Sequence, residues 1–360
     1  MWEVWIHNTR SGSPERRIPV SAASWNRRLG SLGSATHAFV TRGSGLPKSL
    51  INEITRGNKY TIVQRWGRHC AYAGVIRDDR APDNSPILPL RSKEIRAALF
   101  AGRLPHGVNE YTPNGAVLTL TNRSWAGAVG AILDKGTKGG LVAGWELPID
   151  LPADAAGGFS AEWLYEEGLS IGDMFKQVED DGTETDLAPY LAEGDYLRYE
   201  TRVQSTINVG TPFLLPSRAP GSIITNLEPG NDVEVQRTGV LGFGNGWGAD
   251  RLWAYAPQTG DGIRDMPVQD VQISFPDIHD QTRLQRAVDA EFRRRNNPIR
   301  QWGLELHINT YGPAIADVGR LLDVHTFGSD RIPDGVHHLR SIGLSGDMSF
   351  KVTPEVHIYG

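Results

Sequence analysis

The sequence predicts a β-rich α+β protein with two tube-like β-domains, of the barrel or sandwich type, and an intervening mixed helical region. Glycine (41 residues) and proline (22 residues) are frequent in the 360-residue chain, which favours short strands joined by turns. Apolar residues recur with period two toward both ends of the chain and with helical spacing in the middle. The length exceeds what one small core organises, so two or three domains are expected.

The first part of the chain, residues 1–90, is expected to be the N-terminal tube-like β-domain. Residues 2–7 alternate between apolar and polar positions, which is typical of a half-buried strand. The runs 60–66 and 69–76 are rich in β-forming residues and are separated by Gly67 and Arg68, which predicts a hairpin.

Residues 91–220 are expected to form the mixed α/β middle region. Three segments show apolar residues at helical spacing, and they are 92–104, 122–136 and 168–182. Ser92 is a plausible cap for the first helix and Gly136 a plausible stop for the second. A strand is expected over 194–205.

Residues 221–360 are expected to form a second β-domain that carries one long helix, 280–296. Asp280 can cap this helix, and its basic last turn suits the negative end of the helix dipole. Strands are expected over 222–229 and 231–244, and the tail from residue 320 onward is expected to form a meander of three or four strands.

Charge and cysteine content exclude several classes of function. Lys and Arg number 37 against 42 Asp and Glu, a net charge of −5, so a general binder of nucleic acid or of a membrane surface is not favoured. Cys70 is the only cysteine, which excludes an intrachain disulfide and a Cys-rich zinc site and suits a small buried side chain. No secretory signal and no membrane-spanning run is recognisable, so the chain is expected to fold in a reducing cytoplasm.

The most suggestive stretch is VLGFGNGWGADRLWAY, residues 240–255. Gly244, Gly246 and Ala249 satisfy the G-x-G-x-x-A spacing of a dinucleotide-binding turn. Such a turn requires a following helix and a second parallel strand. Residues 249–257 allow barely two helical turns, and turn residues follow them, so no second parallel strand is expected. The glycines are therefore expected to form a bend or the end of a β-hairpin, and no cofactor is predicted.

The other motifs considered predict no catalytic, cofactor-binding or metal-binding residues. LDKGTKGG, residues 133–140, lacks the first glycine of a phosphate-binding loop. His337 and His338 lie in an expected strand, where neighbouring side chains point to opposite faces. Glu162 and Glu166 would share one face only if their segment were helical. The chain is therefore not expected to be an enzyme.

Several stretches, taken in order, resemble hub proteins at the tail tip of long-tailed bacteriophages, in particular minor tail proteins of phages that infect actinobacteria. The resemblance rests on order and pattern along nearly the whole chain. The stretches that carry it are 6–30, 65–79, 88–104, 168–191, 194–205, 231–246 and 335–359.

The resemblance implies a structural virion protein. Such hubs assemble as a ring, usually a homotrimer whose two tube-like domains per subunit mimic six-fold symmetry, and their domains can be interleaved. The implied partners are copies of the chain itself, a distal tail protein, the tape-measure protein and spike or fibre proteins. DNA would pass through the lumen without specific binding. The implied location is the distal end of the tail, after assembly in the host cytoplasm.

Two alternatives stay open at this point. A receptor- or glycan-binding tail protein would use aromatic side chains in loops such as residues 243–255 to stack on cell-wall sugars. A hydrolase would use Glu162, Glu166 or Asp/His pairs.

Overall fold

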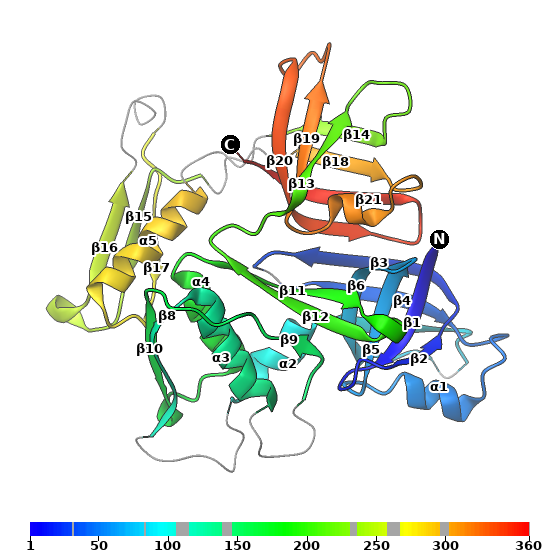
Figure 1. Ribbon diagram of the computed structural model, residues 1–360, viewed down its shortest axis with the longest axis horizontal. Coiled ribbons are helices and arrows are strands. Elements are labelled where there is room, and N and C mark those ends of the chain that lie inside the picture. Colours follow the sequence, from blue (N-terminus) through cyan, green and yellow to red (C-terminus); the bar gives the residue numbers. More distant parts are fainter. Residues whose placement is uncertain are drawn as a thin grey trace.

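The computed structural model describes residues 1–30, 32–82, 84–105, 115–138, 146–230, 236–257, 267–295 and 302–359. Within these residues, most strands join one 13-stranded sheet, and three smaller sheets accompany it (Figure 1). The expected β-rich fold is confirmed. The main hydrogen-bonded path runs from β14 to β2 and is not closed into a barrel, so closed tubes within the subunit are not observed.

The first half of the large sheet, which we call the N-terminal β unit, has the strand order β3-β4-β7-β6-β5-β1-β2. Its core contains Ile6, Phe39 and Ile62, all fully buried. The predicted hairpin is confirmed as β5–β6, and Gly67 at its turn has φ +59. The helix α1 was not predicted. The elements are β1 (Trp2–Asn8), β2 (Pro14–Arg17), β3 (Val20–Arg28), β4 (Ser34–Val40), α1 (Lys48–Ile54), β5 (Tyr60–Trp66), β6 (His69–Asp78) and β7 (Ile87–Lys93).

The second half, the C-terminal β unit, has the order β13-β19-β20-β21-β18-β14. The predicted meander is confirmed, since β19, β20 and β21 pair antiparallel in succession. The strand β13 pairs parallel with β19, so a segment before residue 221 contributes to this unit. The elements are β13 (Val209–Pro216), β14 (Ile224–Pro229), β18 (Trp302–His307), η6 (Pro313–Ala316), β19 (Arg320–Thr326), β20 (Gly335–Gly346) and β21 (Lys351–Ile358).

The middle region contains the sheets β8–β10 and β11–β12–β9 and three helices. All three predicted helices exist. Two of their predicted ends differ from the structure, namely the start of α2 at Ser92 and the end of α3 at Gly136. The elements are α2 (Ile95–Leu99), η1 (Phe100–Gly102), β8 (Ala116–Arg123), α3 (Trp125–Lys138), β9 (Ile149–Asp150), β10 (Phe159–Leu164), η2 (Tyr165–Glu167), α4 (Ile171–Asp180), β11 (Glu184–Leu191), η3 (Glu193–Asp195) and β12 (Leu197–Gln204).

Tertiary packing explains both differences in the helices. Ser92 does not cap α2, because it lies inside β7 with its hydroxyl 3.1 Å from Tyr72 Oη. Gly136 does not end α3, because the helix continues to Lys138. A side chain at position 136 would collide with Ile171 of α4, so this glycine allows the two helices to approach closely.

A third unit, the inserted unit, lies between β14 and β18 in the chain. It consists of the sheet β16-β15-β17, formed by β15 (Gly239–Phe243), β16 (Trp253–Pro257) and β17 (Asp270–Ser274), and of α5 (Gln281–Arg295), which lies across one face of it (Figure 1). Asp280 caps α5 as predicted, because its Oδ1 accepts from the backbone N–H of Arg283 at 2.7 Å. The long helix thus packs on a separate small sheet and not on the sheet of the C-terminal β unit.

Part of the predicted strand 231–244 lies outside the described residues; the observed strand is β15. No helix among the described residues is both long and apolar enough to cross a bilayer.

Candidate functional site

The two β units meet where β20 leaves β19 and pairs with β3. Residues Gly343 to Gly346 of β20 pair antiparallel with Arg28 to Trp25 of β3. The preceding part of β20 pairs with β19 along the same chain. One 12-residue strand therefore belongs to both units and fuses them into a continuous sheet. We call this region the junction.

Aromatic side chains fill one side of the junction. Trp2 lies between Trp25 and Trp66, with ring centroids 5.9 and 5.2 Å apart and edge-to-face geometry. Trp66 in turn contacts Phe350 in the turn between β20 and β21, at 5.7 Å. The indole N–H of Trp2 donates to the carbonyl of Ser349 at 2.6 Å. Three tryptophans of the N-terminal unit thus pack directly onto the C-terminal unit, and the apolar core continues across the junction.

A buried arginine lies on the same face of β3 as Trp25, two residues further along the strand. Arg27 of β3 is 2% exposed, and its three guanidinium nitrogens all donate to carboxylates. Nε contacts Glu94 at 3.1 Å, Nη1 contacts Asp317 at 3.2 Å and Nη2 contacts Asp186 at 3.2 Å. These acceptors come from the start of α2, the segment before β19, and β11. One side chain therefore ties together both β units and the middle region.

The buried carboxylates of this cluster interact with Arg27, and Asp186 also lies 3.9 Å from a second guanidinium, that of Arg202. Burial alone would lower the pKa of Arg27, but Asp186, Asp317 and Glu94 raise it, so the guanidinium stays charged. Burial raises the pKa of Glu94 to about 7 against the opposing effect of Arg27. Burial raises the pKa of Asp186 as well. Arg27 thus faces three carboxylates, of which Asp186 also has Arg202 near by. Glu94 is the carboxylate whose raised pKa lies near neutral pH.

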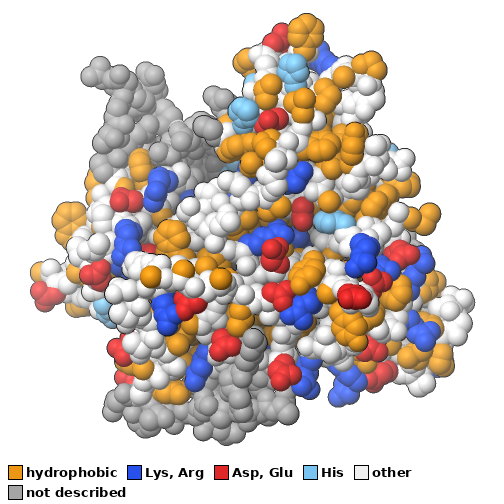
Figure 2. Space-filling view, viewed as in Figure 1, with side chains coloured by type: hydrophobic (Ala, Val, Ile, Leu, Met, Phe, Trp, Pro, Cys, Tyr) orange, Lys and Arg blue, Asp and Glu red, His pale blue; other side chains and the backbone are white. Residues whose placement is uncertain are grey.

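The hairpin β11–β12 forms two further ion pairs at the junction, one with each β unit. Glu184 accepts two hydrogen bonds from Arg340 of β20, at 2.6 and 2.8 Å, which is the strong bidentate geometry. At the other end of the hairpin, Asp195 accepts from Arg65 of β5 at 2.8 Å. The middle region thus contacts each β unit through its own ion pair. Figure 2 shows basic and acidic side chains interspersed across the centre of the side of the molecule that it draws.

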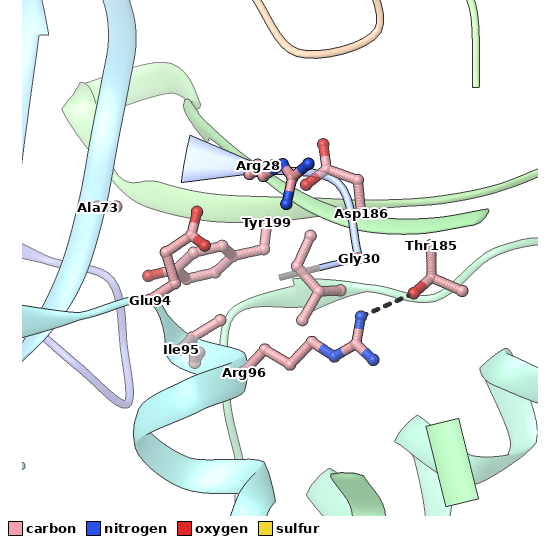
Figure 3. Close-up of a pocket in the computed structure, with 10 residues that line it drawn as sticks. Arg28, Gly30, Ala73, Glu94, Ile95, Arg96, Thr185, Asp186 and Tyr199 are labelled. Atoms are coloured by element: carbon pink, nitrogen blue, oxygen red, sulfur yellow. Dashed lines mark hydrogen bonds between the residues drawn. The ribbon is translucent and has the colours of Figure 1, made fainter. Parts of the chain in front are cut away.

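A small cavity of about 20 Å³ lies beside the Arg27 cluster (Figure 3). Glu94 and Asp186 line it together with Tyr199, and Arg96 donates to Thr185 at its edge at 3.0 Å. This volume accommodates roughly one water molecule, whereas a small-molecule site needs roughly 300–1,000 Å³. The cavity is therefore a packing feature of the junction and not a substrate pocket.

The sequence matches no protein-family model and no curated protein. Solved structures do match over the whole chain. The 43 kDa tail protein of prophage MuSo2 from Shewanella oneidensis has a TM-score of 0.59 at 9% identity, covering 99% of this chain and 98% of that chain. A tail protein from Neisseria meningitidis MC58 has a TM-score of 0.56 at 14% identity, covering 99% and 96%.

This is the fold of phage tail proteins. A third solved structure, the prophage tail protein gp18 from Listeria monocytogenes EGD-e, agrees with a TM-score of 0.52 at 8% identity and covers 99% of this chain and 94% of that chain. The resemblance noted in the sequence is therefore confirmed at the level of the fold. An actinobacterial host finds no support in these structures and stays a prediction.

Within this tail-protein fold, the glycines of residues 240–255 end a β-hairpin, as predicted. The strands β15 and β16 pair antiparallel, and Gly246 and Gly248 have φ +112 and +60 in the turn between them. The expectation that no second parallel strand follows was wrong, because β17 pairs parallel with β15. The connection from β15 to β17 passes through β16, so the strand–helix–strand unit of a dinucleotide site is not formed.

The residues considered for catalysis or metal binding lie on separate elements or bond to separate partners. Glu162 lies on the strand β10 and Glu166 in η2, so the helical face that would bring them together does not exist. His337 and His338 bond to separate partners, Thr326 and Asp323 respectively. In the described part of the chain, no three His, Cys, Asp or Glu side chains gather in a way that could hold a metal ion.

Cys70 is 2% exposed, as predicted, and burial raises the pKa of its thiol to about 12. A thiol in that state is a poor nucleophile at neutral pH.

The residues of the junction were missed at the sequence level, although one signal was present. Ala23, Trp25 and Arg27 alternate with polar neighbours, and all three are buried on one face of β3. Period two therefore places Arg27 on the buried face. A charged residue at such a position requires partners, but nothing local identifies residues 94, 186 and 317 as those partners.

Proposed function

We propose that this protein is a structural component of a phage tail tip. In this role it forms a hub ring that joins the tail tube, through a distal tail protein, to a spike or fibres. The ring opens for the tape-measure protein and for DNA. The observation that carries the proposal is the likeness to tail proteins over 99% of the chain. Because that likeness concerns the fold, the role in the tail requires its own test.

The junction suits such a role mechanically. Each subunit presents two β units side by side. A ring of three subunits therefore contains six β units, a number that matches a six-fold tail tube. Closed rings also cover exposed strand edges between neighbouring copies. The aromatic contacts and the Arg27 cluster hold the two β units at a fixed relative position, so that load is transmitted through the subunit.

The remaining parts of the proposal follow the same role. The protein would lie at the distal end of the tail of a long-tailed phage and would assemble in the cytoplasm of its host, for which actinobacteria are the predicted group. It would act without catalysis and without a cofactor. Its DNA contact would be transient and independent of sequence, in keeping with the net charge of −5.

Immunogold electron microscopy of virions tests the proposal. Antibody against the full chain is expected to label the distal tail tip of intact particles. Antibody against the major tail-tube protein is the matched control and is expected to label the tube. Label on the capsid, along the whole tail or on no particle would refute the tail-tip role.

A further inference from the structure

Among the residues that the structure describes, α5 covers one face of the sheet of the inserted unit and nothing covers the other. On the covered face, Val240, Ala254 and Ala256 pack against Leu284 and Val288 of α5. The opposite face carries the alternate residues of the same strands. We call it the outer face, and its members are Leu241, Phe243, Trp253, Tyr255, Asp270, Gln272 and Ser274.

The outer face is divided into rows of different chemistry. The edge strand β16 contributes an aromatic row, with Trp253 61% exposed and Tyr255 39% exposed. The central strand β15 contributes half-buried apolar side chains, Leu241 and Phe243. The strand β17 contributes a polar row of a carboxylate, an amide and a hydroxyl, from Asp270, Gln272 and Ser274. Exposed aromatic side chains that are bordered by polar residues are typical of binding surfaces.

Hydrogen bonds hold these rows in place. The hydroxyl of Tyr255 donates to Asp270 Oδ2 at 3.1 Å, reaching across β15. Gly239 makes room for this bond, because a Cβ there would lie 2.6 Å from the Tyr255 hydroxyl and 2.7 Å from Asp270 Oδ1. Arg251 lies over the Phe243 ring at 4.8 Å and donates to Ser274 Oγ at 3.1 Å. The aromatic and polar rows are thus coupled before any ligand arrives.

The helix α5 holds the edge strand β16 through hydrogen bonds to its backbone. Gln281 and Gln285, one helical turn apart, donate to the backbone carbonyls of Trp253 and Tyr255 at 2.8 and 3.4 Å. These two carbonyls are therefore already partnered, which hinders addition of another β-strand at this edge. The binding capacity of β16 lies in its side chains.

We propose that the outer face binds a neutral saccharide chain. Trp253 and Tyr255 are two positions apart on one strand, about 7 Å, so neighbouring sugar rings of one chain can rest on them. Sugar hydroxyls would bond to Asp270, Gln272 and Ser274. The outer face carries one carboxylate, Asp270, and the guanidinium of Arg251 lies over its Phe243 ring, so the two charges cancel. This balance fits an uncharged polyol and not a polyanion. The inference goes beyond the hub role, which does not require saccharide binding.

Isothermal titration calorimetry of the purified full chain tests this site. The probes are an N-acetylglucosamine hexamer and a glucose hexamer. Wild type is expected to bind at least one of them, and Trp253→Ala and Tyr255→Ala are each expected to weaken binding at least tenfold. Phe327→Ala removes an aromatic side chain that is 72% exposed on the C-terminal β unit, and it is the matched control, with unchanged binding.

Three results would overturn the proposal. They are no binding of either hexamer to wild type, unchanged binding by Trp253→Ala, and loss of self-association in Trp253→Ala, which would assign the face to a contact between copies of the chain. Thermal unfolding of each variant shows whether it is folded. None of these results bears on the location of the protein in the virion, so failure of this proposal leaves the hub role to its own test.

Discussion

The junction and the outer face of the inserted unit contain similar residues, which are buried and paired at the junction but exposed on the outer face. At the junction, Trp25 is 2% exposed and Arg27 has three carboxylate partners from other parts of the chain. On the outer face, Trp253 is 61% exposed, and Arg251 lies over Phe243 at the surface. The junction is completed within one chain, whereas the outer face is available to something outside it. Residue type alone therefore does not separate structure from recognition in this protein.

The largest expected effect is at Arg27. Arg27→Ala removes the cation that three buried carboxylates share, although Asp186 keeps Arg202 at 3.9 Å, and it is expected to lower the free energy of unfolding by about 3–5 kcal/mol. Arg28→Ala is the matched control, because Arg28 is 45% exposed and pairs with Glu355 at the surface; it is expected to cost less than about 1 kcal/mol. Urea denaturation measures both. Equal losses in the two variants would contradict the role assigned to the Arg27 cluster.

The stability of the junction is also expected to depend on pH, because Glu94 titrates there. The pKa of Glu94 is raised from 4.5 to about 7 in the folded protein, so the folded state binds the proton more tightly than the unfolded state. Its stabilising contribution is complete below about pH 4.5 and is lost as the pH rises through 7. The loss amounts to at most roughly 3 kcal/mol.

Glu94→Gln keeps a neutral side chain at this position and removes that loss. Between pH 5 and pH 8, the free energy of unfolding of wild type is expected to fall relative to that of Glu94→Gln. Parallel curves for the two proteins over this range would show that Glu94 does not titrate as described.

A smaller effect is expected at Gly242, on the covered face of the inserted unit. A side chain there would collide with Val288 of α5, so Gly242→Val is expected to cost about 1–3 kcal/mol by overpacking. Gly248→Ala in the nearby turn meets no atom within 4 Å but has φ +60, and it is expected to cost about 1 kcal/mol. Thermal unfolding compares the two, and a larger loss in Gly248→Ala would contradict the packing of α5 described above.

The smallest effect is expected on the outer face. Trp253→Ala is expected to change the free energy of unfolding by less than about 0.5 kcal/mol, because the side chain is largely exposed. Trp25→Ala at the junction is the matched buried tryptophan and is expected to cost about 3–5 kcal/mol. A large loss in Trp253→Ala would mean that the outer face is part of the core and is not available for binding.

The sequence predicts most local elements because their signals are local. The hairpin β5–β6 follows from two β-rich runs and a glycine turn, and α5 follows from its cap at Asp280 and its basic last turn. The signals at Ser92 and Gly136 fail because tertiary contacts use these residues differently. Ser92 bonds to Tyr72 inside a sheet, and Gly136 accommodates Ile171.

The junction could not be predicted in the same way. Its pairing of β3 with β20 joins positions more than 300 residues apart, and the three acceptors of Arg27 lie on three separate segments. Period two indicates that Arg27 is buried, but only the folded chain identifies its partners. The parallel pairing of β17 with β15 is also non-local, since β16 lies between them in the sequence.

Cryo-electron microscopy of the tail tip, at a resolution that places this chain in the density, tests the central claim most directly. We expect three copies around the tail axis, with N-terminal and C-terminal β units alternating in one ring and the junction intact in each subunit. A ring of six copies, a subunit whose two β units are separated, or a tail tip that lacks this chain would contradict the account.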